Sequence, residues 1–380
     1  SIVLQLLVGS KIINIDTKTD DGKRFFTGIQ KITAVFFVIF EAFIFVMMGG
    51  LSPELGISPF ILIFQLFLGG ILIMMMDEVV SKWGFSSGIS LFIAAGVSKS
   101  IFVRLLSPFT TGGSLGFPFR NDAPSVGRLW EFIYGLSTGD FQLVLLAFFA
   151  VFFTVMIFVM AVYIQSMRVE IPLSFGMVRG HGIRWPLAFM YTSNIPVILV
   201  AALLANITLW GQLLQNWGFP ILGTFSQGQP VSGFVAWITP RNLISDFIQG
   251  TFQPIHIAQS LFFVLVMVGG AILFSFFWVQ TSGMDSKSQA KQIMSSGLQI
   301  PGFRKDERIL ESLLDRYITP LTIMGGATVG LLASLADLSG ALTNGTGLLL
   351  TVMIIYKLYE EIAQQHMMDM NPLMRKFVKQ

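Results

Sequence analysis

The sequence predicts an all-α polytopic membrane protein. Three observations support this prediction: long apolar runs separated by polar segments, basic residues concentrated on alternate sides of those runs, and an unusual composition. Of the 380 residues, 53% are hydrophobic and only 12% are charged. This balance excludes an ordinary soluble domain.

Eight apolar runs give the predicted crossings, and most approach the roughly 20 residues that a helix needs to span hydrocarbon. In chain order they are Thr27–Gly49, Pro59–Met76, Gly88–Leu105, Phe141–Gln165, Leu187–Leu209, Ile257–Val279, Ile318–Leu338 and Gly345–Tyr359. The first ten residues, SIVLQLLVGS, are apolar but too short to cross, and we expect them to be the end of a helix whose beginning is missing. The expected fold therefore has about eight full spans plus a stub.

Charge predicts the orientation of these spans. The segments 10–31, 77–87, 166–186 and 280–317 and the tail from 357 hold 19 of the 24 lysine and arginine residues. Basic residues near the ends of spans are retained in the cytosol. These segments, and with them the C-terminus, are therefore expected to be cytosolic.

Polar residues inside the spans are few. Glu41 lies in the middle of the first run, where its carboxylate belongs either to a polar interior cluster or to a simple interhelical hydrogen bond. Asp337 near the end of the seventh run is expected to reach water, and Lys31 to snorkel to the interface. In the fifth run, Asn194 and Pro196 predict either a helix that bends at a buried amide, which suggests a gate, or a kinked helix that only packs.

Small residues recur in the spans, at Gly69-Gly70, Gly269-Gly270 and Gly326…Gly330. Such pairs permit close helix packing. The cytosolic segments 166–186 and 280–317 are long and basic, which is typical of solvated positive-inside loops but also suits an anionic lipid surface or RNA partner.

Enzyme chemistry finds little support. The histidines His181, His256 and His366 are placed in separate loops or the tail, without metal-ligand spacing, and we expect no catalytic residues, metal or cofactor. The competing class is an ion-coupled secondary transporter. It would need a second midplane acid beside Glu41, and none is present in the sequence.

Several segments, in order from end to end, resemble the SecY family in its archaeal form. They are LQLLVGS (4–10), DEVVSKWG (77–84), SGISLFIAAGVS (87–98), YTSNIPVIL (191–199), RYI (316–318) and GTG (345–347). The resemblance implies ten spans in two halves related as inverted repeats. It gives residues 1–104 to the N-terminal half, without the first span and plug, 105–140 to an external connection, 141–362 to the C-terminal half and 363–380 to a cytosolic tail.

By this resemblance the protein is the pore subunit of a channel that passes unfolded secretory chains across the cell membrane and releases transmembrane segments into lipid. The positions that match the family's aliphatic pore ring are Ile89, Ile93, Ile198 and Leu350. Glu41 and Asn194 match the polar cluster of its lateral gate, with Pro196 as the expected gate hinge.

The resemblance also implies partners. Arg179 and Arg304, with Lys305 and Arg308 as neighbours, match basic loop positions that contact the ribosome and its RNA. The other expected partners are SecE and a beta subunit in a heterotrimer, signal peptides, nascent chains and membrane lipid.

Overall fold

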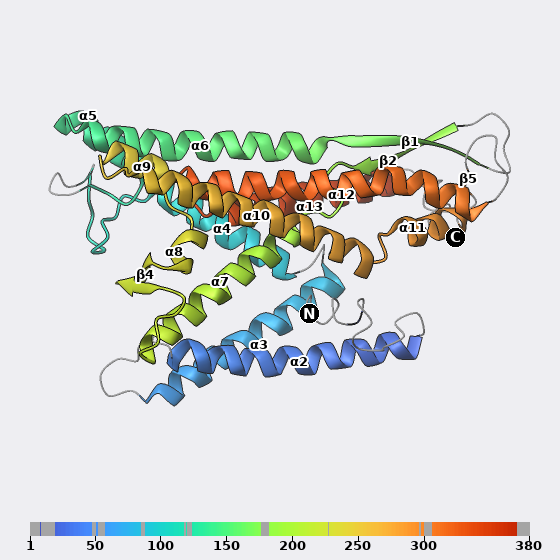
Figure 1. Ribbon diagram of the computed structural model, residues 1–380, viewed down its shortest axis with the longest axis horizontal. Coiled ribbons are helices and arrows are strands. Elements are labelled where there is room, and N and C mark those ends of the chain that lie inside the picture. The colour runs from blue at the N-terminus through green and yellow to red at the C-terminus, as the bar shows by residue number, and fades with distance from the viewer. Residues whose placement is uncertain are drawn as a thin grey trace. The chain divides into compact units, whose positions relative to one another are not determined.

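The computed structural model describes residues 8, 20–47, 51, 58–84, 88–117, 119, 124–175, 182–226, 228–295, 298–299 and 306–370 (Figure 1). By its contacts the chain forms two units. The first unit comprises Ser1–Phe92 with Gln280–Gly283, and the second comprises Ile93–Val279 with Met284–Gln380.

The first unit contains an antiparallel pair of long helices, α2 (Asp20–Met47) and α3 (Pro59–Trp83). Lys31 of α2 pairs with Glu78 of α3 at 2.9 Å, while Gly70 lies directly against Val38. Helix α3 begins with a proline after Ser58, where the missing N–H costs nothing. None of its side chains is buried, which suits a helix surrounded by lipid or by other apolar helices.

The second unit holds the remaining long helices. Its helices are the greater part of α4 (Gly88–Leu106), α5 (Arg128–Thr138), α6 (Phe141–Ser166), α7 (Ile195–Asn216), α8 (Phe234–Ile238), α9 (Leu243–Ile248), all but the last two residues of α10 (Pro254–Thr281), α11 (Ser286–Ser295), α12 (Glu307–Leu338) and α13 (Gly345–Met370).

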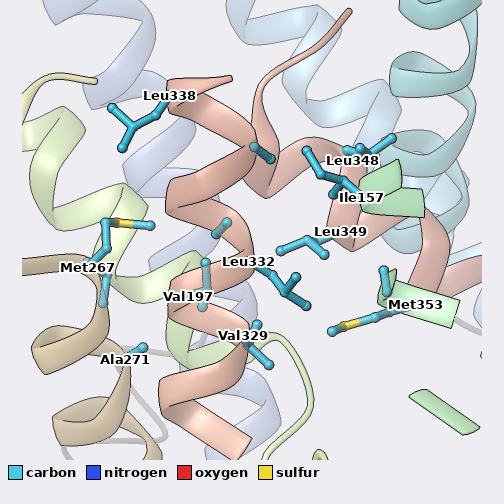
Figure 2. Packing of buried hydrophobic residues seen from close by; sticks show 14 of the residues in the cluster. Ile157, Val197, Met267, Ala271, Val329, Leu332, Leu338, Leu348, Leu349 and Met353 are labelled. Atoms are coloured by element: carbon cyan, nitrogen blue, oxygen red, sulfur yellow. The ribbon is translucent and has the colours of Figure 1, made fainter. Parts of the chain in front are cut away.

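Helix α12 lies at the centre of the core of the second unit. Figure 2 shows Val329 and Leu332 of α12 between Met267 and Ala271 of α10 on one side and Leu349 of α13 on the other. The small residues predicted to permit close packing do so here. A Cβ atom added at Gly330 would lie 3.0 Å from the Ala271 Cβ atom and from the Met267 carbonyl oxygen, so α10 and α12 approach at van der Waals distance.

The fold is mostly helical, as predicted, and two small sheets of short strands accompany the helices. Strands β1 (Arg168–Phe175) and β2 (Gly182–Ala188) form an antiparallel hairpin, and β5 (Leu298–Gln299) pairs with β1 on its other side. Strands β3 (Thr224–Ser226) and β4 (Gln229–Ser232) form a second hairpin. Figure 1 shows the first sheet and α11 at one end of the second unit, with α5 and α9 at the opposite end.

Seven helices in the described ranges are long and apolar enough to span a membrane, one each over the first seven predicted runs. The eighth run, Gly345–Tyr359, forms the first part of α13, whose later turns carry Lys357, Glu360 and Glu361. These charges interrupt the apolar window that a full crossing needs.

The fifth predicted span was wrong at its start. Leu187 and Ala188 belong to β2, where they pair with Val169 and Arg168, and helix α7 begins only at Ile195. Apolarity alone does not distinguish a strand that packs in the core from the first turns of a helix.

Candidate functional site

The residues YTSN (191–194) form a tight turn between strand β2 and helix α7. Ser193 has a φ of 56°, the only positive φ among the described residues other than glycine. Its hydroxyl donates a hydrogen bond to the Asn194 side-chain oxygen at 3.1 Å. Asn194 is the N-cap residue of α7, and its carbonyl accepts the backbone N–H of Ile198 at 3.2 Å. Asn194 and Ile198 therefore stand one helical turn apart, at the start of α7.

Pro196 lies in the first turn of α7, not in its middle. The prediction that it bends a continuous span was wrong, because a proline in the first turn removes no intrahelical hydrogen bond. It fixes where the helix begins. A change of direction in this part of the chain takes place at the turn before the helix.

Two side-chain contacts, one buried and one partly buried, hold the YTSN turn to helix α10 and to the residues that follow it. The Tyr191 hydroxyl donates a hydrogen bond to the Met284 carbonyl at 2.7 Å, and the Thr192 hydroxyl lies 3.2 Å from that of Ser275. Burial, followed by the nearby Asp285 carboxylate, raises the pKa of Tyr191 to about 12, so the phenol stays protonated as a donor. The start of α7 is therefore positioned by side chains.

Three of the predicted ring residues are next in the chain to buried core residues. Ile198 and Leu350 are half-buried, and each follows a fully packed neighbour, Val197 and Leu349. Ile93 is 37% exposed and precedes the buried Ala94. Residues at the margin of a packed face can line a narrow passage and still be held by the core.

Ile89, the remaining ring candidate, lies in the first turn of α4. Its backbone N–H donates to the Asp77 carboxylate at 2.9 Å. Asp77 thus satisfies one of the free amides at the start of α4 and links the segments DEVVSKWG and SGISLFIAAGVS. The side chain of Ile89 is 49% exposed.

Helices α4 and α13 run antiparallel, as two contacts show. A Cβ atom added at Gly347 would lie 3.3 Å from a Val97 methyl group, and the Arg104 guanidinium donates to the Leu342 carbonyl at 2.9 Å. Residue numbers rise from Val97 to Arg104 along α4, while those of their partners fall from Gly347 to Leu342. Ile93 precedes Val97 by one turn and Leu350 follows Gly347 by about one turn, so the two ring candidates lie at similar heights.

Glu41 is exposed on α2, in the first unit, whereas Asn194 belongs to the second. Their pairing stays a prediction. Lys31, expected to snorkel, instead pairs with Glu78, which also binds Lys82 at 2.7 Å. The lysine therefore ties α2 to α3.

Of the predicted ribosome contacts, Arg179, Arg304 and Lys305 lie outside the described residues. Arg308 is exposed in the first turn of α12, after the N-cap residue Asp306. At the base of the hairpin, Arg168 pairs with Glu360 of α13. This contact connects the basic hairpin with the last helix.

Sequence reasoning missed the role of Asp337 and of a histidine cluster. Asp337 does not simply reach water: its carboxylate accepts the Gly345 N–H at 2.6 Å. His256 lies inside α10 and not in a loop, with its Nε2 atom 2.8 Å from the Arg241 guanidinium and its Nδ1 atom 3.1 Å from Asp246. The positions of Asp337 before a short turn, and of Asp246 and Arg241 near His256, were the only sequence signals.

Among the described residues no group of three or more histidine, cysteine, aspartate or glutamate side chains could hold a metal ion. The polar groups found here act on backbone or on one another. The arrangement consists of helices held together by packing and hydrogen bonds, with partly exposed aliphatic side chains next to the core.

Comparison with known proteins gives matches along the whole chain. The SecY family model matches residues 1–359. The chain is 46% identical to the protein translocase subunit SecY of Methanothermobacter thermautotrophicus, covering 100% of this chain and 81% of the relative. It is 42% identical to the subunit of Pyrococcus horikoshii, covering 100% and 82%.

Solved structures agree. A structure described as that of a protein conducting channel has a TM-score of 0.79 and 41% identity, covering 97% of this chain and 79% of the other. Sec61 in a canine ribosome-channel complex from the endoplasmic reticulum has a TM-score of 0.75 and 40% identity, with 97% and 79% covered.

Proposed function

Because the chain belongs to the SecY family, we propose that it is the pore subunit of a protein-conducting channel that moves unfolded secretory polypeptides across the membrane. The observation that carries the proposal is the match, over 97% of the chain, to a solved protein conducting channel at 41% identity. The protein is a multi-pass membrane protein, and the proposed location is the cell membrane with a cytosolic C-terminus.

The proposed seal is a ring formed by Ile89, Ile93, Ile198 and Leu350. Aliphatic side chains have no hydrogen bonds to satisfy, so a ring of them excludes water and ions when closed and accepts any passing side chain when open. The similar heights of Ile93 and Leu350 on antiparallel helices support this proposal, as does their place beside the packed core.

The proposed lateral gate includes Asn194 and Glu41. Asn194 stands at the start of α7, and the turn before it changes direction at Ser193. A polar pair across a gate favours the closed state, and an apolar signal helix that enters the gate displaces it. We place the hinge of this movement at the YTSN turn, because Pro196 lies within the first helical turn.

The proposed cytosolic partner is the ribosome, because the similar Sec61 structure comes from a ribosome-channel complex. Arg179, Arg304, Lys305 and Arg308 would meet phosphates of ribosomal RNA. Such contacts release counterions and weaken as salt rises. SecE, a beta subunit, signal peptides and membrane lipid complete the proposed set of partners.

The ion-coupled transporter is not favoured. Of the two acids considered inside spans, Asp337 is engaged with the backbone of Gly345 and Glu41 is exposed on α2. Neither is paired with a second carboxylate among the described residues, so no acidic cluster for a coupling ion is present there.

The proposed function is tested by transport into liposomes. The full-length protein would be reconstituted with its partner subunits and given ribosomes that carry a signal-bearing secretory chain. We expect the chain to become protected from added protease, and a matched chain with a charged residue in the signal core to stay accessible. Equal accessibility of both chains, with ribosomes bound, would contradict the proposal.

A further inference from the structure

The short turn Ser339–Asn344 joins α12 to α13, and three side chains bind it or the residue after it. Arg104 of α4 donates to the Leu342 carbonyl at 2.9 Å, and the Leu342 N–H donates to the Thr154 hydroxyl of α6 at 2.9 Å. Asp337 accepts the N–H of Gly345 at 2.6 Å. Both backbone groups of Leu342 are thus satisfied by side chains from two other helices.

The Thr154 contact is buried, whereas the Arg104 contact is only partly so. Thr154 and Leu342 are 7% and 4% exposed, and the threonine hydroxyl also donates to the Ala150 carbonyl at 2.7 Å. A cavity of about 410 Å³ beside the turn is lined by Arg104, Asp337 and Asn344, among others. This space lets water reach the guanidinium N–H groups that do not bond Leu342, so the charge is not buried in an apolar core.

Arg104 is placed where it can control the spacing of two helices that carry ring candidates. Helix α4 bears Ile89 and Ile93, while Leu350 lies in the second turn of α13. Farther along both helices, a Cβ atom added at Gly347 of α13 would meet a Val97 methyl group of α4, so this approach between the helices is apolar. Leu342 lies in the turn that leads into α13, so the charge-assisted hydrogen bond from Arg104 is a directional link between α4 and the residues just before α13.

We propose that Arg104 is a positioning residue that holds the pore ring closed by fixing the first turns of α13 against α4, with Thr154 holding the same turn from α6. The inference rests on the proposed function. Loss of the bond would let α13 shift at its N-terminal end, which would loosen the ring. The closed state would then be less favoured relative to the open one.

The test compares Arg104→Met with two matched variants in the complete complex, reconstituted in liposomes. Arg104→Lys keeps a charged donor, and Lys99→Met removes an exposed charge from the same helix. The readouts are the leak of small ions through the idle channel and the transport of a secretory chain with a weakened signal. We expect Arg104→Met to raise both by roughly tenfold, since a hydrogen bond from a charged group is lost. Arg104→Lys should raise them less, and Lys99→Met should match the parent.

Thr154→Val supplies a second, nearly isosteric variant in case Arg104→Met does not assemble. It removes only the hydroxyl that accepts the Leu342 N–H, and we expect the same increases in leak and in use of weak signals. The inference would be overturned if Arg104→Met, or Thr154→Val in its place, showed the same ion leak and the same signal requirement as Lys99→Met. A parent complex that transports no signal-bearing chain would instead contradict the proposed function, so the two failures are distinguishable.

Discussion

The Asp337 carboxylate, near the end of α12, accepts a 2.6 Å hydrogen bond from the backbone N–H of Gly345, the first residue of α13. One helix thus caps the next across a short turn. A helix start has free N–H groups, and a carboxylate there also interacts favourably with the helix dipole. The contact explains why an acid occurs near the end of an otherwise apolar run.

Asp337→Ala is therefore expected to destabilise the protein by about 1 kcal/mol, the usual cost of losing a capping side chain. Asp337→Asn keeps an oxygen acceptor and should cost less. Thermal unfolding of the purified complex in detergent measures both. Equal stability of the alanine variant and the parent would show that the cap contributes nothing.

Gly330→Ala is expected to destabilise the packing of α10 and α12 by about 1–3 kcal/mol, the range for overpacked cores. The added methyl group would meet Ala271, Val268 and the Met267 carbonyl at 3.0 Å. Gly269→Ala is the matched control, because no atom lies within 4 Å of its added Cβ. It should be neutral or stabilise the helix by up to about 1 kcal/mol. The same unfolding measurement compares them, and equal effects would refute the close approach.

Asn194→Leu and Glu41→Leu are expected to shift the hydrophobicity that a signal needs to open the gate. Each change removes a polar group from the proposed closed gate. The measurement is insertion of a graded series of signals, from weakly to strongly apolar, by the parent and each variant. An unchanged threshold in both variants would exclude these residues from the gate.

Reversal of Arg179 and Arg304 to glutamate is expected to lower ribosome affinity and to flatten its dependence on salt, because phosphate contacts are lost. Co-sedimentation with ribosomes over a salt series measures both quantities. Lys99→Glu, a reversal on the helix α4, is the control and should leave binding unchanged. Binding of the double variant equal to that of the parent at low salt would reject the contact.

The sequence predicted the long helices well, because a helix in lipid must satisfy its own backbone and needs a long apolar run. It failed at Leu187–Leu209, where strand β2 and the YTSN turn occupy the first part of an apolar run. Because the run was read as one helix from Leu187, Pro196 was placed in its middle and assigned to a bend. The helix start could be recognised only by weighing proline in the first turn against proline in the middle.

The candidate ring came from resemblance alone, since Ile89, Ile93, Ile198 and Leu350 are ordinary apolar residues by composition. Long-range contacts could not be predicted from local pattern. Arg104 and Leu342 are 238 residues apart in the chain, and Thr154 and Leu342 are 188 apart. Such pairs depend on how helices pack, which no local spacing reveals.

The most direct test of the central claim is site-specific crosslinking from a photoreactive residue at Ile93, and separately at Ile198, in membranes that contain the complete protein and its partners. The target is a secretory chain stalled on the ribosome during transport. We expect crosslinks from both positions that depend on a functional signal sequence. Their absence, with the protein intact and ribosomes bound, would contradict the assignment of these residues to a protein-conducting pore.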